Sequence, residues 1–335
     1  MGLKRSSEPR TDHARGTKEA VRDHSHVARR GTSASGQPSP RMGGKGLESP
    51  GARSRFRYQS LVLVALALAL PSAASSTPPG ANGLIAFVSD GRAAGLRGPG
   101  IAVIRADGRG ARLLTHGQDD LSPAWSPAGT RVVFTRRGDL YVIRADGTHL
   151  RRLASGAVVD YDPAWSPDGR QIAFLRDNAL LVMRADGRNM RVVYSDATAV
   201  LGGLTWSPDG KSIAFGSDYG TIGTILVVAR TSGEPWAPAT GREDDEYPDW
   251  SPGGGWIAFT RNVDDEDGVW VARTDGTGFT RMLTDDGADP SWAPNGKRIV
   301  VSSVSRGLVI LDLGGTGRVL VPIGGSQPAW QSVSP

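Results

Sequence analysis

Acidic residues that gather in short groups between strand-like segments are the residues of this chain best suited to chemistry. The groups are Asp119 and Asp120; Asp160 and Asp162; Asp244, Asp245 and Glu246; Asp264, Asp265, Glu266 and Asp267; and Asp285, Asp286 and Asp289. Carboxylates gathered on one surface attract cationic ligands, metal ions or basic protein surfaces. An aspartate before a strand also commonly caps a turn through its own backbone. The groups therefore predict either a negative binding surface or a repeated structural cap.

The densest group, within residues 262–268, invites comparison with a calcium-binding loop. With Asp265 and Asp267 at the third and fifth ligand positions of an EF-hand, Gly268 falls correctly, but Val263 and Thr274 then occupy the first and twelfth positions. This excludes an EF-hand. An irregular Ca²⁺ site made by Asp264, Asp265 and Asp267 is the alternative to a solvated acidic loop.

A tryptophan-containing repeat supplies the elements that must position these acids. The motif reads PAWSPAG, PAWSPDG, LTWSPDG, PDWSPGG, PSWAPNG and a final PAWQ, and its tryptophans are separated by 40, 41, 44, 42 and 38 residues. These tryptophans are Trp125, Trp165, Trp206, Trp250, Trp292 and Trp330. Each motif ends one strand in a tight turn, and further strands follow, the last two joined by Ala-Asp-Gly or Thr-Asp-Gly hairpins. A period near forty with four strands per unit predicts β-propeller blades.

The number of units predicts an all-β, six-bladed propeller over residues 82–331. Residues 82–115 contain three strands of a unit and lack its tryptophan strand, whereas Trp330 ends the chain on a tryptophan strand with no unit after it. We expect the two ends to pair in one blade, which would close the ring and remove its exposed edges. The tryptophans are then expected to pack blade against blade.

The Trp-Ser-Pro-Asp-Gly and Ala-Asp-Gly-Thr elements resemble the WD40-like (PD40) repeats of the TolB-type β-propeller family. The resemblance covers nearly all of the chain after residue 82. TolB carries an additional α/β domain before its propeller, and the resemblance implies that this chain is a relative without that domain. It also implies that the tryptophan strand is the innermost of each blade.

That arrangement would bring the acidic loops to one mouth of the propeller. We expect a ligand or partner there to be bound by Asp119, Asp120, Asp160, Asp162, Asp244, Asp245, Glu246 and Asp289, with Trp236 as a further contact. Trp236 lies off the repeat, where a Pro-flanked aromatic replaces the ordinary fourth strand, so it is either an interaction residue or a loop-packing residue.

The sequence carries few signals of catalysis. After residue 74 there are two histidines, His116 and His149, and the chain has neither cysteine nor a Gly-x-Ser-x-Gly, His-Glu-x-x-His or phosphate-loop motif. No catalytic residue and no cofactor other than the alternative Ca²⁺ is assigned. The sequence favours a non-enzymatic protein-binding scaffold. The alternatives are a hydrolase or lyase with its site in the central channel, and a calcium-stabilised binding module.

The N-terminal region indicates export. Residues 1–56 are basic, polar and predicted to be disordered, with Met42 as an alternative start. Residues 57–74 are predicted to be a signal peptide cleaved after Ala74, or an uncleaved anchor. The basic flank is Arg53, Arg55 and Arg57, and a ten-residue apolar core and small terminal residues follow it. Residues 75–81 are then a linker. Residues 1–74 hold 13 of the 39 Lys and Arg but 5 of the 34 Asp and Glu. The positive net charge therefore belongs to this leader and does not predict nucleic-acid binding. We expect a monomer that is periplasmic, in the cell envelope or secreted.

Overall fold

The computed structural model describes residues 81–92, 95–220, 223–231, 233–238, 244–264, 266–321 and 325–333. Within them every regular element is a β-strand, and no helix is long and apolar enough to cross a membrane. The predicted leader, signal peptide and linker lie outside the described residues, apart from Ala81.

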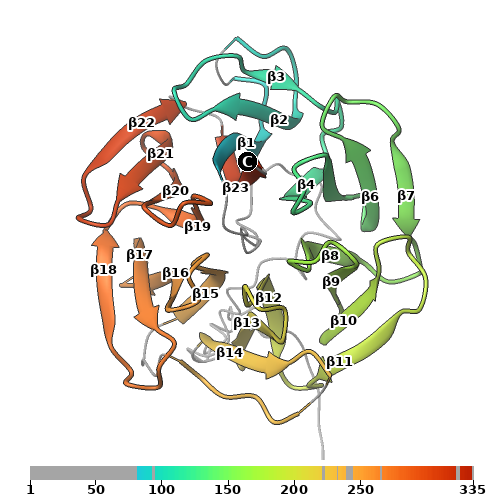
Figure 1. Ribbon diagram of the computed structural model, residues 1–335, viewed down its shortest axis with the longest axis vertical. Coiled ribbons are helices and arrows are strands. Elements are labelled where there is room, and N and C mark those ends of the chain that lie inside the picture. Colours follow the sequence, from blue (N-terminus) through green and yellow to red (C-terminus); the bar gives the residue numbers. More distant parts are fainter. Residues whose placement is uncertain are drawn as a thin grey trace, which may run out of the picture. The chain divides into compact units, whose positions relative to one another are not determined.

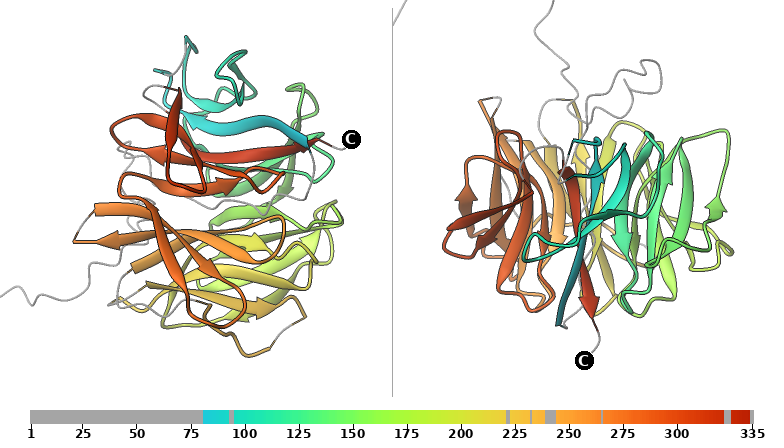
Figure 2. Two further views of the ribbon diagram at one scale, coloured as in Figure 1. Left: turned by 60° about the vertical axis from the view of Figure 1, so that its left-hand side comes forward. Right: turned by 90° about the horizontal axis from the view of Figure 1, so that it is seen from above.

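Six antiparallel sheets surround a central axis as the blades of a propeller, and the tryptophan strand is the innermost in each (Figures 1 and 2). From the inner strand outward, blade 1 contains β23 (Gly325–Val333), β1 (Ala81–Ser89), β2 (Gly100–Arg105) and β3 (Arg112–Leu113); blade 2 contains β4 (Asp120–Trp125), β5 (Arg131–Arg136), β6 (Asp139–Arg144) and β7 (Arg151–Ala154); and blade 3 contains β8 (Asp160–Trp165), β9 (Gln171–Arg176), β10 (Ala179–Arg184) and β11 (Arg191–Ser195). Blade 4 contains β12 (Val200–Trp206), β13 (Ser212–Asp218) and β14 (Gly223–Ala229); blade 5 contains β15 (Asp244–Trp250), β16 (Trp256–Val263), β17 (Glu266–Arg273) and β18 (Thr280–Thr284); and blade 6 contains β19 (Ala288–Trp292), β20 (Arg298–Ser303), β21 (Gly307–Asp312) and β22 (Gly317–Val321). The predicted all-β, six-bladed fold is confirmed.

The ring closes in blade 1, as the sequence predicts. The C-terminal strand β23 lies inside β1 and pairs with it in antiparallel register, with Ile85 opposite Trp330 and Ala86 opposite Ala329. The first blade therefore takes its inner strand from the far end of the chain. This pairing leaves no open sheet between the last blade and the first.

Each repeat tryptophan packs on the preceding blade. Trp125 of blade 2 shares a cluster with Ile101 and Val103 of blade 1, and Trp330 shares one with Val300 and Leu308 of blade 6. All six repeat tryptophans are buried. A large flat side chain in every interface fills the wedge between adjacent twisted sheets, which explains why the repeat retains tryptophan.

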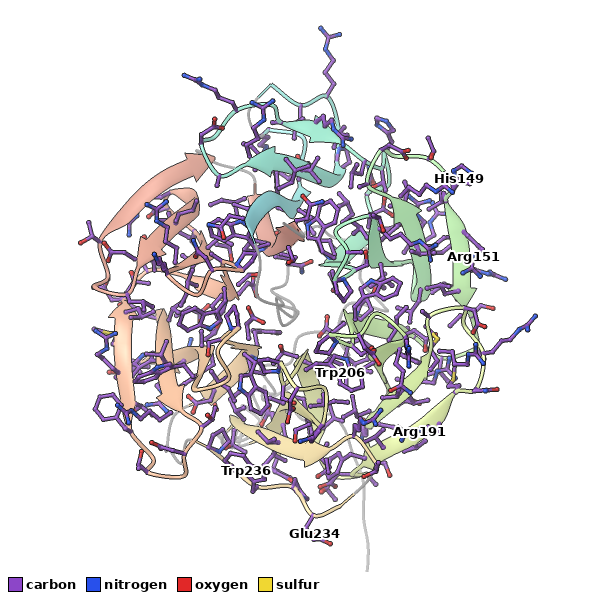
Figure 3. The ribbon with its side chains drawn as sticks, in the orientation of Figure 1. His149, Arg151, Arg191, Trp206, Glu234 and Trp236 are labelled. Carbon is purple, nitrogen blue, oxygen red and sulfur yellow. The ribbon has the colours of Figure 1, made fainter. Side chains whose placement is uncertain are left out.

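A second repeated contact joins the outer edges of the blades. Arginines on four outer strands donate to main-chain carbonyls in the hairpin turns of the next blade. The pairs are Arg112 with Ala145, Arg151 with Asp186, Arg191 with Arg230, and Arg281 with Leu313. Figure 3 labels Arg151 and Arg191 at this edge. Because these contacts are exposed, each contributes modestly to stability.

Blade 4 departs from the repeat at its outer edge. Its sheet has three strands, and Trp236 takes the place of the fourth through a two-way backbone bridge with Val227. The Val227 N–H donates to the Trp236 carbonyl at 2.7 Å, and the Trp236 N–H donates back at 2.9 Å. The Pro-flanked segment therefore replaces the ordinary fourth strand, as its sequence predicts.

Candidate functional site: the acidic mouth

The mouth is the end of the propeller where the inner strands begin and the loops between second and third strands turn. In blade 2, Asp120 at the start of β4 lies opposite Arg136 at the end of β5, and Arg136 lies opposite Asp139 at the start of β6. Blade 5 has the same arrangement, with Asp244 opposite Asn262 and Val263 opposite Glu266. The acids at these positions in different blades are thereby brought to one end of the molecule.

Three of the mouth acids form buried ion pairs within their own blades. Asp120, Asp160 and Asp245 are each at most 1% exposed. Each accepts two hydrogen bonds from an arginine on the next strand, and the Nη2–Oδ2 distances are 2.7 Å to Arg136, 2.9 Å to Arg176 and 2.8 Å to Arg261. Each guanidinium also lies 5.3–5.6 Å from the ring centre of a phenylalanine on its own strand. The hydrogen bonds that Arg176 donates to Asp160 raise the pKa of Arg176, so the arginine stays charged.

These ion pairs are present in some blades and absent from others. Where the aspartate is absent, the arginine is absent as well: Leu201 lies opposite Ser217 in blade 4, and Gly325 lies opposite Ser89 in blade 1. A carboxylate and a guanidinium are both costly to bury alone, so they occur together or not at all. The negative charge of these three aspartates is therefore compensated inside the protein.

A second set of mouth residues forms a ring of left-handed backbone around the channel. The third residue before each repeat tryptophan has φ between 49° and 54° in all six blades; these residues are Ser122, Asp162, Gly203, Tyr247, Asp289 and Gln327. Five of the six are not glycine, and a left-handed conformation costs such a residue about 1–2 kcal/mol. The inner strand bulges at this point in every blade.

Side-chain hydrogen bonds between blades hold part of this ring. Gln327 Oε1 accepts from the Ser122 N–H at 2.7 Å, and Ser122 Oγ donates to Asp162 Oδ1 at 2.9 Å. Asp162 Oδ2 accepts from the Gly203 N–H at 2.9 Å. Four blades are thus joined in sequence, which assigns Asp162 a structural role. The sequence signal for this ring is that five of its six residues directly precede a proline.

Four acids, Asp218, Asp244, Glu246 and Asp267, lie near one another between blades 4 and 5. Glu246, in the inner strand β15, is half-buried. Burial raises its pKa well above the ordinary value, and the charges of Asp267, Asp244 and Asp218 raise it further. Among the described residues, no arginine or lysine forms an ion pair with Glu246. Glu246 therefore lies among three other acids at this part of the mouth.

Solved structures with the same architecture include two TolB proteins. TolB from Acinetobacter baumannii superposes with a TM-score of 0.65 and 23% identity, over 75% of this chain and 67% of that one. A protein from Agrobacterium tumefaciens described as a TolB superposes with a TM-score of 0.59 and 22% identity, over 74% of this chain and 91% of that one. The fold is that of a TolB-type six-bladed β-propeller. The nidogen/laminin complex contains a chain that matches with a TM-score of 0.63 but 11% identity, over 76% of this chain and all of that one. No protein-family model and no curated protein sequence matches this chain.

Replacing Glu246 in this TolB-like propeller by glutamine is expected to stabilise it at neutral pH. The folded state holds the Glu246 proton to a higher pH than the unfolded chain does, so stability falls as pH rises from about 4.5 through the raised pKa. Glu246→Gln removes that fall. We expect a melting temperature about 2–4 °C higher at pH 7.5, as for ~1 kcal/mol in a domain of this size, and no gain at pH 4.

Thermal unfolding followed across pH checks this prediction, with Glu234→Gln as the matched control. Glu234 is exposed at the outer edge of blade 4 (Figure 3). Asp249 and Asp289 also have pKa values raised by burial, so both proteins retain part of the slope. An equal melting temperature of wild type and Glu246→Gln at pH 7.5 would contradict the raised pKa of Glu246.

The other predicted site residues of the TolB-like propeller lie in different places. Asp119 is exposed and pairs with Arg137 at 3.2 Å, and Asp244 accepts the Gly223 N–H at 2.8 Å. Asp289 is buried and accepts from Ser302 Oγ at 2.9 Å. Trp236 is 42% exposed at the outer edge of blade 4, so the structure does not bring it together with the mouth acids (Figure 3).

The calcium alternative concerns the loop between β16 and β17. Asp264 has a left-handed φ of 52°, and Asp267 accepts from Asn262 Nδ2 at 2.8 Å. Asp265 lies outside the described residues. Within the described part of the chain, no three His, Cys, Asp or Glu side chains converge to hold a metal ion. An irregular Ca²⁺ site that includes Asp265 stays a prediction.

Proposed function

We propose that this TolB-like propeller is an exported, non-enzymatic scaffold that binds a protein with a basic surface at its mouth. The observation that carries the proposal is the sector between blades 4 and 5. There burial of Glu246, together with repulsion from Asp267, Asp244 and Asp218, raises the pKa of Glu246. A cationic side chain of the partner reduces this repulsion, so its positive charge favours binding.

The rest of the mouth is a less suitable surface for a basic partner than this sector, because its aspartates already have partners within the protein. The aspartates of blades 2 and 3 at the mouth, Asp120 and Asp160, are neutralised by Arg136 and Arg176. Asp162 is committed to hydrogen bonds between blades. Among the described residues no arginine or lysine forms an ion pair with Glu246. A closed propeller presents this side chain on a rigid frame, so a partner binds without the cost of ordering a loop.

Export is supported by the apolar core of residues 61–70 and the small residues that end at Ala74. The N-terminal sequence of the protein recovered from the producing cell tests this point. We expect it to begin at Ser75 in a periplasmic, envelope or secreted fraction. Recovery of intact residues 57–74 in a cytosolic fraction would contradict export.

Affinity capture from envelope extract tests the binding proposal. We expect wild-type protein to retain a basic partner that elutes as salt rises, because contacts between charges at a rim are screened. Glu246→Gln combined with Asp267→Asn is expected to reduce the retained partner about tenfold, and the control Glu234→Gln is expected to retain it fully. Equal retention by all three proteins would refute the mouth as the binding surface.

A further inference from the structure

The end of the propeller opposite the mouth, which we call the base, is rich in arginine on three neighbouring blades. The base consists of the turns between first and second strands and the hairpins between third and fourth strands. In blades 1 to 3 these are residues 105–112, 126–131, 144–151, 166–171 and 184–191, which contain ten arginines and four aspartates. Nine of the ten arginines are exposed. The base of these blades is therefore positively charged, whereas the mouth is acidic.

Most of these arginines have no carboxylate partner. Among the described residues, one ion pair involves them, between Arg184 Nε and Asp186 Oδ2 at 3.6 Å. Arg112, Arg151 and Arg191 each donate to a main-chain carbonyl of the next blade, which does not compensate their charge. The four aspartates accept hydrogen bonds from main-chain N–H groups of their own turns. The aspartates therefore have a structural role in the turns, and the positive charge of the base is in excess.

One cross-strand position shows the difference between the blades clearly. The first residue of the second strand lies opposite the last residue of the third strand, and in blade 2 these residues are Arg131 and Arg144. In blade 6 they are Arg298 and Asp312. Like charges in directly opposed positions destabilise a strand pair, whereas opposite charges stabilise it. Blade 2 thus has two cations that repel each other, and an anionic group beside them reduces that repulsion.

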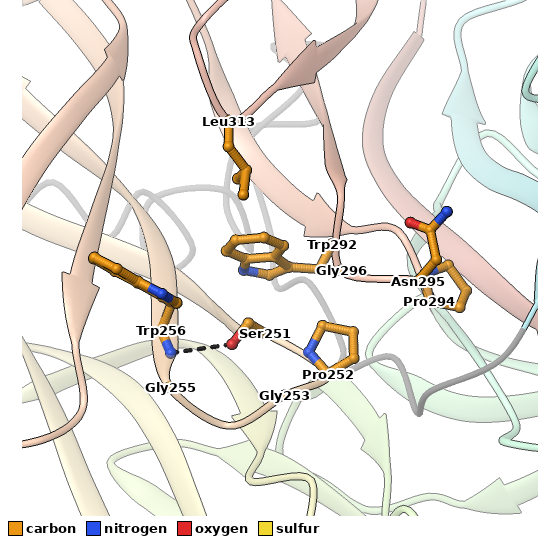
Figure 4. Close-up of a pocket in the computed structure, with 10 residues that line it drawn as sticks. All are labelled: Ser251, Pro252, Gly253, Gly255, Trp256, Trp292, Pro294, Asn295, Gly296 and Leu313. Carbon is orange, nitrogen blue, oxygen red and sulfur yellow. Dashed lines mark hydrogen bonds between the residues drawn. The ribbon is translucent and has the colours of Figure 1, made fainter.

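The base of blades 4 to 6 has less excess charge. Its residues 207–212, 229–236, 251–256, 273–281, 293–298 and 312–317 contain six basic and four acidic residues. A pocket of about 610 Å³ lies between blades 5 and 6, and its lining, which includes Pro252, Trp256 and Leu313, has no charged side chain (Figure 4). Trp256 takes the place that Arg131 has in blade 2, and the Arg273 guanidinium opposite it lies 5.2 Å from its ring. The excess positive charge of the base therefore lies mainly over blades 1 to 3.

The chain also enters the propeller at the base. Ala81, the first residue of β1, lies opposite Val333, the last residue of β23, whereas Gln327 nearer the start of β23 belongs to the ring at the mouth. Figure 2 (right) shows the start of β1 beside the C-terminus at one end of the molecule. The predicted apolar core of the leader ends at Leu70, eleven residues before Ala81. Eleven residues span at most about 40 Å, so an uncleaved anchor would hold the base toward the membrane.

We propose that the base of blades 1 to 3 binds the surface of a membrane that contains anionic lipids. Guanidinium groups form bidentate hydrogen bonds with phosphate oxygens, and each basic side chain near an anionic lipid surface adds to the attraction. The arginines are spread over the turns and hairpins of three blades, so a lipid surface contacts them together, whereas a small anion contacts one or two. The mouth then faces away from the membrane, toward its partner. The inference rests on the export in the proposed function, which brings the propeller to the envelope, but not on the partner at the mouth.

Cosedimentation with lipid vesicles tests the proposal. The protein is the chain from Ser75, which is the product expected after cleavage, contains every strand of the closed ring and lacks the basic leader. We expect it to bind vesicles of phosphatidylglycerol and phosphatidylcholine in equal parts at low salt, and to be released as the salt rises. Vesicles of phosphatidylcholine alone are expected to bind it at least about tenfold more weakly. Absence of binding to the anionic vesicles at millimolar lipid overturns the proposal, as does binding to heparin without binding to vesicles.

A double variant that copies another blade separates the charge of the base from the stability of the fold. Arg131→Ser with Arg144→Ala gives blade 2 the residues that blade 4 has at these positions, Ser212 and Ala229, so the variant is expected to fold. Its affinity for anionic vesicles is expected to fall about tenfold or more, because two cations leave the surface.

The matched control removes the same charge from the other direction of blade 2. Arg137 and Arg152 are exposed and pair with Asp119 and Asp139 toward the mouth, at 3.2 and 3.1 Å. Arg137→Ser with Arg152→Ala is expected to bind vesicles like wild type. Equal affinity of the two double variants overturns the proposal, since binding would then follow net charge or neither set of arginines.

A fluorophore on an introduced cysteine reports which end meets the lipid, because the chain has no cysteine of its own. Thr148 is exposed in the base hairpin of blade 2, and Gln118 is exposed at the mouth beside Asp119. We expect spin-labelled lipid in anionic vesicles to quench the fluorophore in Thr148→Cys and to leave that in Gln118→Cys unchanged. Quenching at Gln118→Cys without quenching at Thr148→Cys overturns the proposal.

The mouth variant Glu246→Gln with Asp267→Asn distinguishes this inference from the proposed function. It leaves the base unchanged, so its vesicle binding is expected to equal that of wild type. Vesicle binding without capture of any envelope partner would leave the base established and the mouth proposal refuted. Capture of a partner that depends on Glu246, without vesicle binding, would have the reverse meaning.

Discussion

Arg261→Ser is expected to lower the free energy of unfolding by about 3–5 kcal/mol. The substitution leaves the Asp245 carboxylate, 1% exposed, without the two hydrogen bonds that Arg261 donates to it. It also removes the guanidinium from its place 4.8 Å from the Trp270 ring. Urea denaturation followed by tryptophan fluorescence measures the change.

The chain itself supplies the control for this prediction. Blade 4 has Leu201 and Ser217 at the positions of Asp245 and Arg261. The double variant Asp245→Leu with Arg261→Ser copies that blade into blade 5 and removes the uncompensated charge. It is expected to recover stability to within about 1–2 kcal/mol of wild type, because apolar replacement of a buried ion pair is often nearly neutral. A double variant as unstable as Arg261→Ser would show that the pair itself stabilises the blade.

The ion pairs, of which these variants remove one, explain why the acidic mouth was only partly predictable from the sequence. Placing Asp120, Asp160 and Asp245 at one end of the propeller required only the repeat and its strand order. Their neutralisation required knowing that the residue sixteen positions later faces them across a strand pair. Arg136, Arg176 and Arg261 stand at that spacing, so the signal was present in the sequence. This spacing can be recognised as an ion pair once the register between the first two strands of a blade is known.

The blade count was more predictable because it depends on local and repeated features. Turn residues and strand periodicity fix each unit, and the unpaired tryptophan strand at Trp330 indicates closure. Contacts between particular side chains of adjacent blades, such as those around the pocket between blades 5 and 6, were not predictable in this way. This pocket is lined by Gly253 and Trp256 of one blade and by Leu313 of the next, and contacts between blades follow from packing rather than from the period. Residues that depart from the repeat were the useful sequence signal, but their meeting point required the structure.

Removal of β23 is expected to have the largest effect of any change considered for this propeller. Deletion of residues 325–335 takes the inner strand from blade 1 and Trp330 from its cluster with Val300 and Leu308. It exposes the edge of β1, whose Ile85 and Ala86 are fully buried in the closed ring. We expect the cooperative thermal transition to be lost and β1 to become sensitive to protease.

Two milder substitutions distinguish the effect of the cavity left by Trp330 from the effect of opening the ring. Trp330→Ala and Trp125→Ala each remove an indole from an interface between blades, and each is expected to cost about 3–5 kcal/mol. In Trp125→Ala the ring stays closed by β23, whereas Trp330→Ala weakens the strand that closes it. If closure couples the blades, Trp330→Ala lowers the cooperativity of unfolding as well as its midpoint, and a peptide of residues 325–333 restores part of the transition in the deletion variant. A deletion variant that unfolds at the wild-type midpoint would contradict this prediction. It would show that blades 2 to 6 and the three remaining strands of blade 1 hold together without β23, so that the pairing of the chain ends is not what stabilises this fold.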